Sequence, residues 1–145
     1  MRRILLKPRR DWLAKAEAVG FTWHHVDGAR YWDERACYAF TLAQVEDHIE
    51  AAAQELHQMC LALVGEVAGS EALMARLAIP EGARDLVAAS WTAKEPSLYG
   101  RFDFGYDGAA PPKLYEYNAD TPTSIYEAAV FQWLWLEDRI ADGTF

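Results

Sequence analysis

Two short runs near the carboxyl end of the chain alternate polar and apolar side chains with the period of a β-strand. They read R-F-D-F and K-L-Y-E-Y-N. Because successive side chains of a strand point to opposite faces, Arg101 and Asp103 share one face of the first run, and its aromatic residues lie on the other. In the second run Glu116 and Asn118 share a face with Leu114, opposite the tyrosines. Each run is therefore expected to form a strand with two distinct faces.

The segment between these runs, D-G-A-A-P-P, favours a chain reversal because its Asp-Gly and Pro-Pro pairs cannot continue either strand. We predict an antiparallel hairpin in which aromatic residues meet across the ladder, since a slip of one residue would scatter polar groups over both faces. The pairs expected in this register are Tyr106 with Lys113, Phe104 with Tyr115, Asp103 with Glu116, and Arg101 with Asn118.

This register places the carboxylates of Asp103 and Glu116 opposite each other, which is destabilising by up to about 1 kcal/mol. A divalent cation would offset the repulsion, and Mg²⁺ is usually held by one or two carboxylates together with substrate phosphates. Asn118 can add an amide oxygen, and the guanidinium of Arg101 can clamp a phosphoryl or carboxylate group. The hypothesis is a Mg-nucleotide or acyl-phosphate site. The alternative is that Arg101 only pairs with an acid on a solvated face.

The segment that follows Asn118 reads A-D-T-P-T-S and leads into an apolar stretch. Ser124 and Glu127 match the spacing of a capping box, which predicts that a helix begins there. A helix N-terminus with exposed N–H groups and neighbouring hydroxyls can also bind an anion. The hydroxyls of this segment are therefore either caps alone or caps that also contact a substrate.

The motifs S-L-Y-G-R-F-D-F and K-L-Y-E-Y-N-A-D-T-P-T-S-I-Y-E-A-A together resemble the glutathionylspermidine synthase family, a branch of the ATP-grasp ligases. The similarity includes W-D-E-R-A-C-Y and T-L-A-Q-V-E, and it covers most of the chain as the amino-terminal part of the synthetase. The resemblance implies ATP-dependent amide formation. In that reaction the carboxylate of a glutathione-like peptide is phosphorylated to an acyl phosphate, which a polyamine such as spermidine then attacks.

Carried over by motif, the resemblance implies that Asp103, Glu116 and Asn118 are magnesium ligands. It also implies that Arg101 stabilises the transferring phosphoryl group, which agrees with the importance of charge neutralisation in phosphoryl transfer. The residues expected to hold the peptide substrate are Thr121, Thr123 and Ser124. Family members that use spermidine carry a cysteine after E-Y-N-A-D, whereas this chain reads T-P-T-S. The identities of the peptide and the amine are left open by that departure.

A chain of 145 residues and 16.4 kDa is the size of one domain, so we expect a single domain over residues 1–145. ATP-grasp ligases need further segments to cover the nucleotide, and no Gly-rich phosphate loop is found in the sequence. We therefore expect an amino-terminal fragment of a larger synthetase that is inactive by itself, with most of the ATP site in missing carboxy-terminal ATP-grasp segments. The rival hypothesis is a non-catalytic binding or interaction module that retains the hairpin without ligase activity.

Composition indicates a soluble globular protein with 52% hydrophobic and 25% charged residues. A net charge of −8 argues against a nucleic-acid partner, and no stretch is long enough to span a membrane. The start of the chain has no secretory signal, which makes the cytoplasm the expected location. The one dense basic cluster, R-R-I-L-L-K-P-R-R, is interpreted as a solvated terminal arm.

The fold class predicted from these patterns is α+β, with helices packed on a small, mostly antiparallel sheet that carries the hairpin. The resemblance identifies this as the pre-ATP-grasp-like portion of a ligase. A capping-box match of Thr41 with Gln44 begins a long helix, which runs to about Val67 and is expected to be the main core helix. A closing helix is expected from Ile125 to about Ala141.

Overall fold

The computed structural model describes residues 1–121 and 123–145. Its contacts separate into two compact units. One comprises Met1–Phe40 and the carboxyl-terminal segment that ends at Phe145, and the other comprises Thr41–Thr121. Both units combine helices with short antiparallel strand pairs, so the α+β prediction is confirmed. Compact units can belong to one domain, and the prediction of a single domain over residues 1–145 stays a prediction.

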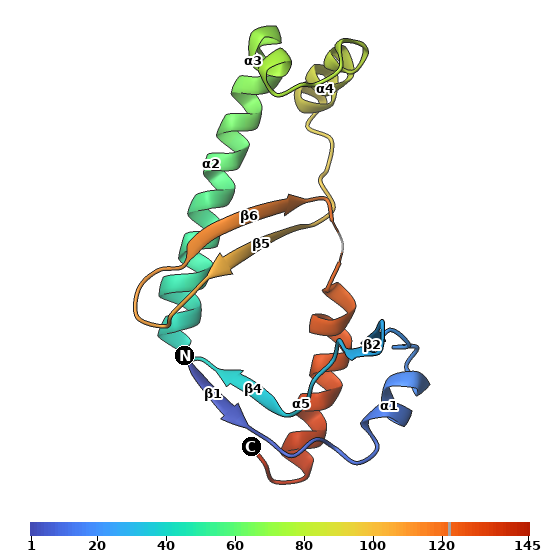
Figure 1. The fold of residues 1–145 in the computed structure, drawn as a ribbon. Coiled ribbons are helices and arrows are strands. Elements are labelled where there is room, and N and C mark those ends of the chain that lie inside the picture. The colour runs from blue at the N-terminus through green and yellow to red at the C-terminus, as the bar shows by residue number, and fades with distance from the viewer. Residues whose placement is uncertain (122) are drawn as a thin grey trace. The chain divides into compact units, whose positions relative to one another are not determined.

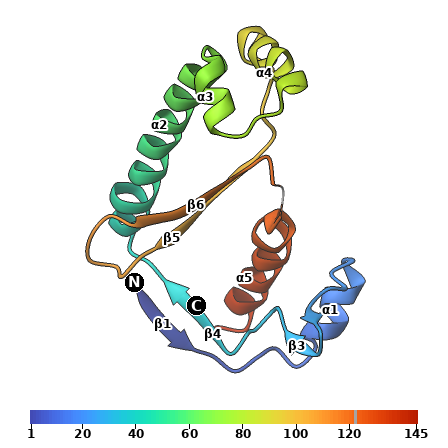
Figure 2. The same ribbon diagram turned by 45° about the horizontal axis from the view of Figure 1, so that its top comes forward.

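The first unit pairs its amino-terminal strand with a strand that follows the first helix and a tight hairpin (Figure 1; Figure 2). Its elements are β1 (Arg2–Leu5), α1 (Trp12–Ala18), β2 (His25–Val26), β3 (Ala29–Arg30), β4 (Ala36–Ala39), the π-helical segment η2 (Glu127–Phe131) and α5 (Gln132–Ala141). The β2–β3 turn uses Asp27 and Gly28 at φ of 50° and 79°, the left-handed backbone that a two-residue hairpin loop requires. The expected closing helix is confirmed, because helical backbone begins at Ile125 and α5 ends at Ala141.

The core of this unit is aromatic. Phe21 and Phe131 are fully buried with ring centroids 4.8 Å apart, and Trp32 packs edge-on to Phe131 at 4.8 Å. The buried side chains of η2 and α5 recur every fourth residue, at Phe131, Trp135 and Arg139, which gives this helix one buried stripe.

A buried ion-pair network surrounds that core. The guanidinium of Arg9 donates to Glu34 at 2.6 Å and to Asp138 of α5 at 2.6 Å, and its side chain is 4% exposed. Glu34 also accepts from the backbone N–H of Arg9 at 3.1 Å and from the indole N–H of Trp32 at 3.1 Å. Lys15 of α1 donates to Asp138 at 2.6 Å, so the network joins the amino-terminal segment, α1 and α5.

The prediction of a solvated basic arm is correct for the exposed side chains of Arg2, Arg3, Lys7 and Arg10, but it is wrong for Arg9 and for the conformation of the segment. Arg2–Leu5 forms β1 in register with β4, and Arg9 is buried against two carboxylates. The acidic partners of Arg9 are distant in the sequence, so a run of basic residues does not reveal them.

The second unit contains the long helix, two shorter helices and the hairpin (Figure 1). Its elements are the π-helical segment η1 (Gln44–Glu50), α2 (Ala51–Ala68), α3 (Glu71–Arg76), α4 (Glu81–Ala93), β5 (Gly100–Gly105) and β6 (Lys113–Ala119). The predicted capping box is confirmed. The N–H of Thr41 donates to Gln44 Oε1 at 3.0 Å, and the N–H of Gln44 donates to Thr41 Oγ1 at 3.2 Å.

The long helix was predicted to be the main core helix, but most of its apolar side chains are not buried. Leu42 is 70% exposed and Met59 60%, whereas the buried residues of α2 are Val67 and Ala68. The π-helical segment η1 changes the phase of the side chains relative to a continuous α-helix. In addition, α2 meets α4 at Gly65, where a Cβ would lie 3.2 Å from the Trp91 ring. The absence of a side chain at Gly65 therefore leaves room for the Trp91 ring against α2.

Replacing Arg9 by methionine is expected to lower the free energy of unfolding by about 3–5 kcal/mol, because it leaves the Glu34 carboxylate buried without its main cation. The matched control is Arg35→Met. Arg35 pairs with Asp33 at 2.5 Å on the surface, and an exposed pair contributes about 1 kcal/mol or less. Urea denaturation measures both variants, and equal losses would contradict the structural role of the Arg9 network.

Candidate functional site

Strands β5 and β6 form the predicted hairpin. The half that lies away from the turn, which we call the outer half, has the predicted register. Asp103 pairs with Glu116, and Arg101 pairs with Asn118. Paired residues of an antiparallel ladder lie on the same face, so the structure brings these four side chains together. The prediction that they converge on one side of the hairpin is met.

The inner half of the hairpin, next to the turn, differs from the prediction. A β-bulge lies between Asp103 and Phe104, so that Phe104 pairs with Leu114 and Gly105 pairs with Lys113. The predicted pairs of Phe104 with Tyr115 and of Tyr106 with Lys113 are wrong. The bulge inserts one extra residue on β6, which puts Leu114 on the face of Phe104.

Aromatic rings pack on the opposite face at glycine positions. Phe102 stacks on Tyr117 with centroids 4.2 Å apart, and the Tyr117 ring covers Gly100, where a Cβ would overlap it. Tyr115, the extra residue of the bulge, covers Gly105 with its hydroxyl 2.7 Å from the Cβ position. Gly105, however, alternates onto the face of Arg101 and Asp103, so this contact lies on the polar side. Both glycines of β5 are therefore needed for the close approach of the tyrosine rings.

On the polar face the four groups form two short contacts. Arg101 Nε donates to Asp103 Oδ1 at 2.8 Å, and Asn118 Nδ2 donates to Glu116 Oε1 at 3.1 Å. The hydrogen bond from Arg101 holds the pKa of Asp103 below its ordinary value, and the positive charge of Arg101 acts in the same direction. The side chains of Arg101 and Asp103 are 30% and 38% exposed, so the pair is accessible to a ligand.

The oxygen atoms of Asp103, Glu116 and Asn118 could supply part of the coordination of a hard cation. Two facing carboxylates and an amide are oxygen ligands of the kind that Mg²⁺ takes. Among residues 1–121 and 123–145, no three His, Cys, Asp or Glu side chains lie close enough together to hold a metal ion by themselves. A magnesium ion at this site would therefore complete its coordination with Asn118, water or substrate phosphate, and Asp103, Glu116 and Asn118 stay a predicted ligand set.

Asp120 has a role that the sequence analysis did not assign. Its backbone is left-handed with φ of 51°, and its Oδ1 accepts from the N–H of Leu98 at 2.8 Å and from the N–H of Tyr99 at 3.4 Å. The carboxylate thus ties the chain entering β5 to the chain leaving β6. An aspartate directly after a strand is the available signal, because Asp tolerates left-handed backbone and accepts from nearby N–H groups.

The predicted substrate residues follow Asp120. The hydroxyl of Thr121 donates to the Ala119 carbonyl at 3.3 Å, and Pro122 lies outside the described residues. Thr123, which is exposed, and Ser124, which is half-buried, belong to the first unit. The substrate contacts of Thr121, Thr123 and Ser124 stay a prediction.

The capping box predicted for Ser124 and Glu127 is wrong. Ser124 has a left-handed backbone with φ of 68°, whereas an N-cap residue is normally extended. The carboxylate of Glu127 accepts from Trp23 Nε1 at 3.1 Å and from the Tyr31 hydroxyl at 2.7 Å instead. The helix still begins at the predicted place, because Ala128 N–H donates to the Ser124 carbonyl at 3.2 Å.

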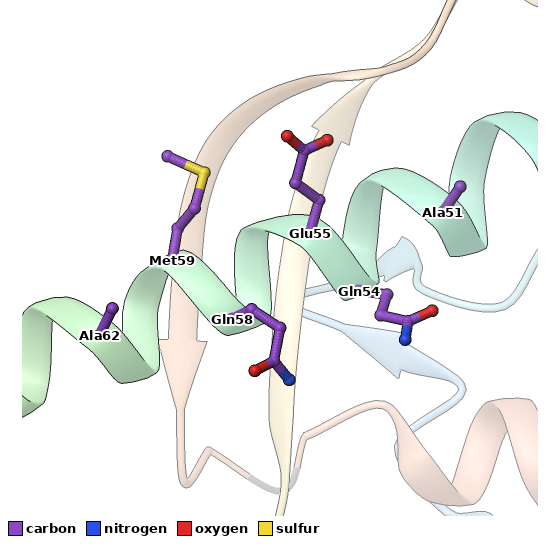
Figure 3. Close-up of a pocket in the computed structure, with 6 residues that line it drawn as sticks. All are labelled: Ala51, Gln54, Glu55, Gln58, Met59 and Ala62. Carbon is purple, nitrogen blue, oxygen red and sulfur yellow. The ribbon is translucent and has the colours of Figure 1, made fainter.

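A shallow groove runs along one side of α2 (Figure 3). It is lined by Ala51, Gln54, Glu55, Gln58, Met59 and Ala62. All six side chains come from one helix, and none belongs to the predicted site.

No helix in the described part of the chain has the length and apolarity needed to cross a membrane.

Comparison with known proteins gives matches along nearly the whole chain. The family model for the glutathionylspermidine synthase preATP-grasp region matches residues 3–144. A putative acid–amine ligase of Haemophilus influenzae is 44% identical over 141 residues, which is 94% of this chain and 35% of the ligase. Trypanothione synthetase of Crithidia fasciculata is 29% identical over 84 residues, which is 57% of this chain and 13% of the synthetase. The chain thus spans about a third or less of the length of these relatives.

Replacing Arg101 by methionine is expected to raise the pKa of Asp103 toward or above its ordinary value of 3.8, because the variant loses the hydrogen bonds and positive charge that stabilise the carboxylate. Carboxyl carbon NMR over a pH titration measures this shift. The control is Lys113→Met, which removes a cation from the same hairpin but not from the polar cluster. An unchanged Asp103 titration in the Arg101 variant would show that the pair does not persist in solution.

Proposed function

This chain belongs to the glutathionylspermidine synthase preATP-grasp family, and we propose that it is the metal- and substrate-binding portion of an ATP-dependent carboxylate–amine ligase. The relatives are named as an acid–amine ligase and a trypanothione synthetase, which supports ligase chemistry. The observation that carries the proposal is the polar face of β5–β6, where Asp103 and Glu116 face each other beside Arg101 and Asn118. This cluster provides oxygen ligands and a guanidinium on one accessible surface.

Amide formation in this proposal has two balanced steps. A carboxylate oxygen of the peptide substrate attacks the γ-phosphorus of ATP, and ADP leaves with the electron pair of the broken bond. The amine nitrogen then attacks the acyl carbon, inorganic phosphate leaves, and the amine gives up a proton. A bound Mg²⁺ would supply charge neutralisation at the phosphate oxygens.

The protein groups of the hairpin have distinct tasks in the first step. Asp103, Glu116 and Asn118 would hold Mg²⁺ through their oxygens. Arg101 would turn from Asp103 to the phosphoryl group and stabilise the charge that develops there. Breaking the ion pair of Arg101 with Asp103 would cost little free energy, because an exposed ion pair contributes only about 1 kcal/mol or less.

Peptide and amine substrates are proposed by class. The family description and the trypanothione synthetase match support a glutathione-like peptide carboxylate and a polyamine nitrogen as the reacting groups. Thr121, Thr123 and Ser124 follow the hairpin and offer hydroxyls for contacts with the peptide.

The nucleotide site is proposed to need more than this chain. Because the chain covers 35% of the acid–amine ligase, we place most ATP contacts in carboxy-terminal ATP-grasp segments that correspond to the rest of that relative. The 145-residue chain alone is then expected to be inactive, and the whole ligase to act in the cytoplasm.

A second candidate function is a binding module that keeps the hairpin without catalysis. The pairing of Arg101 with Asp103 is the observation that favours it, because this contact neutralises both charges without a ligand. The two candidates differ in their dependence on metal and nucleotide.

In the full-length protein, Asp103→Asn and Glu116→Gln are each expected to lower Mg-ATP-dependent acyl phosphate formation by at least about 100-fold, because each removes a carboxylate proposed to hold the Mg²⁺ that would neutralise the phosphoryl group. Acyl phosphate is trapped with hydroxylamine, and ADP release is measured in parallel. The control is Glu66→Gln, which changes an exposed acid of α2 in the same unit. Full activity in both hairpin variants, with circular dichroism unchanged, would refute the metal assignment. Absence of Mg-ATP-dependent acyl phosphate formation in the wild-type full-length protein would favour the binding module.

A further inference from the structure

We propose that Gln44 and His48 of η1 are positioning residues that fix the turn and the bulged register of the β5–β6 hairpin, and thereby orient the Asp103–Glu116 carboxylates. This inference deepens the proposed function and rests on it for its metal-binding consequence. Both residues lie outside the polar cluster, and all the contacts involved belong to the second unit.

The side-chain amide of Gln44 has both of its ends engaged. Oε1 accepts from the N–H of Thr41 at 3.0 Å in the capping box, while Nε2 donates to the carbonyl of Gly108 at 2.7 Å. An N–H needs an acceptor and a carbonyl needs a donor, so the two partners fix the orientation of the amide. Gln44 therefore links the start of the long helix to the hairpin turn.

His48 lies one turn further along η1 and makes the second contact. Its Nδ1 is 2.9 Å from the hydroxyl of Tyr106, and the two rings meet edge to face with centroids 6.0 Å apart. Tyr106 directly follows β5, so His48 holds the strand at the point where it enters the turn. Single-turn π-helical segments are frequent at functional sites, and here η1 presents both anchoring side chains.

The turn itself is pre-formed to receive these contacts. Asp107 Oδ1 accepts from the N–H of Ala109 at 2.8 Å and from the N–H of Ala110 at 3.4 Å, which closes a local turn. Gly108 has φ of 87°, a conformation that a residue with a Cβ rarely adopts. Its backbone carbonyl, held in that conformation, accepts from Gln44.

The anchors act on the carboxylates through the bulge. Pairing without a bulge would keep Asp103 opposite Glu116 but would pair Tyr106 with Lys113. The observed bulge directly follows the Asp103–Glu116 pair, and a bulge increases local twist and re-aims the side chains beside it. Holding the turn in place selects between the two arrangements, so Gln44 and His48 orient the carboxylates without touching them.

The capping box provides a test that separates positioning from helix stability. Gln44→Glu keeps an oxygen to accept from Thr41 N–H, since glutamate is a normal capping-box residue, but it removes the donor to Gly108. Thr41→Ala does the reverse, because it removes the hydroxyl acceptor of the cap and leaves both amide contacts of Gln44 possible. The first variant is expected to change the hairpin and the second only the helix start, at about 1 kcal/mol of stability.

A second pair of variants tests the other anchor. His48→Phe keeps an aromatic ring beside Tyr106 and removes the nitrogen. His48→Asn places an amide near the former Nδ1 and is expected to restore the contact in part. Rescue by asparagine but not by phenylalanine is the outcome that a role in bulk packing would not produce.

NMR of the 145-residue protein supplies two readouts. The first is hairpin geometry, from the cross-strand Overhauser contacts of Phe104 with Leu114 and from amide exchange in β5 and β6. Gln44→Glu and His48→Phe are expected to weaken these contacts and to speed exchange roughly fivefold, as loss of one hydrogen bond would. The second is line broadening by Mn²⁺ at Asp103 and Glu116, where the same variants are expected to weaken apparent affinity on the order of tenfold. Thr41→Ala should match the wild type in both.

The outcomes separate this inference from the proposed function. Absence of Mn²⁺ broadening in the wild type would count against the metal site, and the exchange and Overhauser data would still decide the positioning role. The positioning role is overturned if Gln44→Glu and His48→Phe leave the hairpin unchanged, or if Thr41→Ala alters it equally. It is also overturned if the hairpin changes while wild-type Mn²⁺ affinity is retained.

Discussion

Asp103 and Glu116 face each other across the β5–β6 ladder, and like charges in that position repel. The hairpin is kept in this register by contacts on its other face and at its ends. Tyr117 packs over Gly100 on that other face, Asp120 ties the open end together, and Gln44 holds the turn. A repulsive pair that is maintained by contacts elsewhere supports the proposed cation site, because little rearrangement would be needed on binding.

The outer half of the site could be predicted from the sequence because side-chain alternation decides it. Arg101 with Asn118 and Asp103 with Glu116 are paired as alternation requires. The half next to the turn could not be predicted, because alternation gives no signal for a bulge, and we infer that contacts from η1 to the turn hold it in place. The alternation of side chains depends only on the strand in which they lie. A change of register that is held by contacts from another element therefore leaves no periodic signal in the sequence.

The same limit explains the errors in the helices and at the amino terminus. The capping box at Thr41 is local and was predicted correctly, whereas the one at Ser124 fails because Glu127 is engaged by Trp23 and Tyr31, about a hundred residues earlier in the chain. The basic cluster was interpreted as solvated, but Arg9 has its acidic partners far along the sequence. Fold class and element positions follow from periodicity, and the partners of individual polar groups follow from the tertiary structure.

Burial decides which arginine is available for chemistry. Arg9 has a 4% exposed side chain and pairs with a fully buried carboxylate, so breaking that pair leaves an uncompensated charge at a cost of about 3–5 kcal/mol. Arg101 and Asp103 are partly exposed, and their pair contributes about 1 kcal/mol or less. A metal ion and a phosphate can therefore replace the partners of Asp103 and Arg101, whereas no ligand could compete for Arg9. The proposed function thus treats the ion pair on the hairpin and the ligand site as two states of one cluster, in which the guanidinium of Arg101 pairs with Asp103 until a cation takes its place.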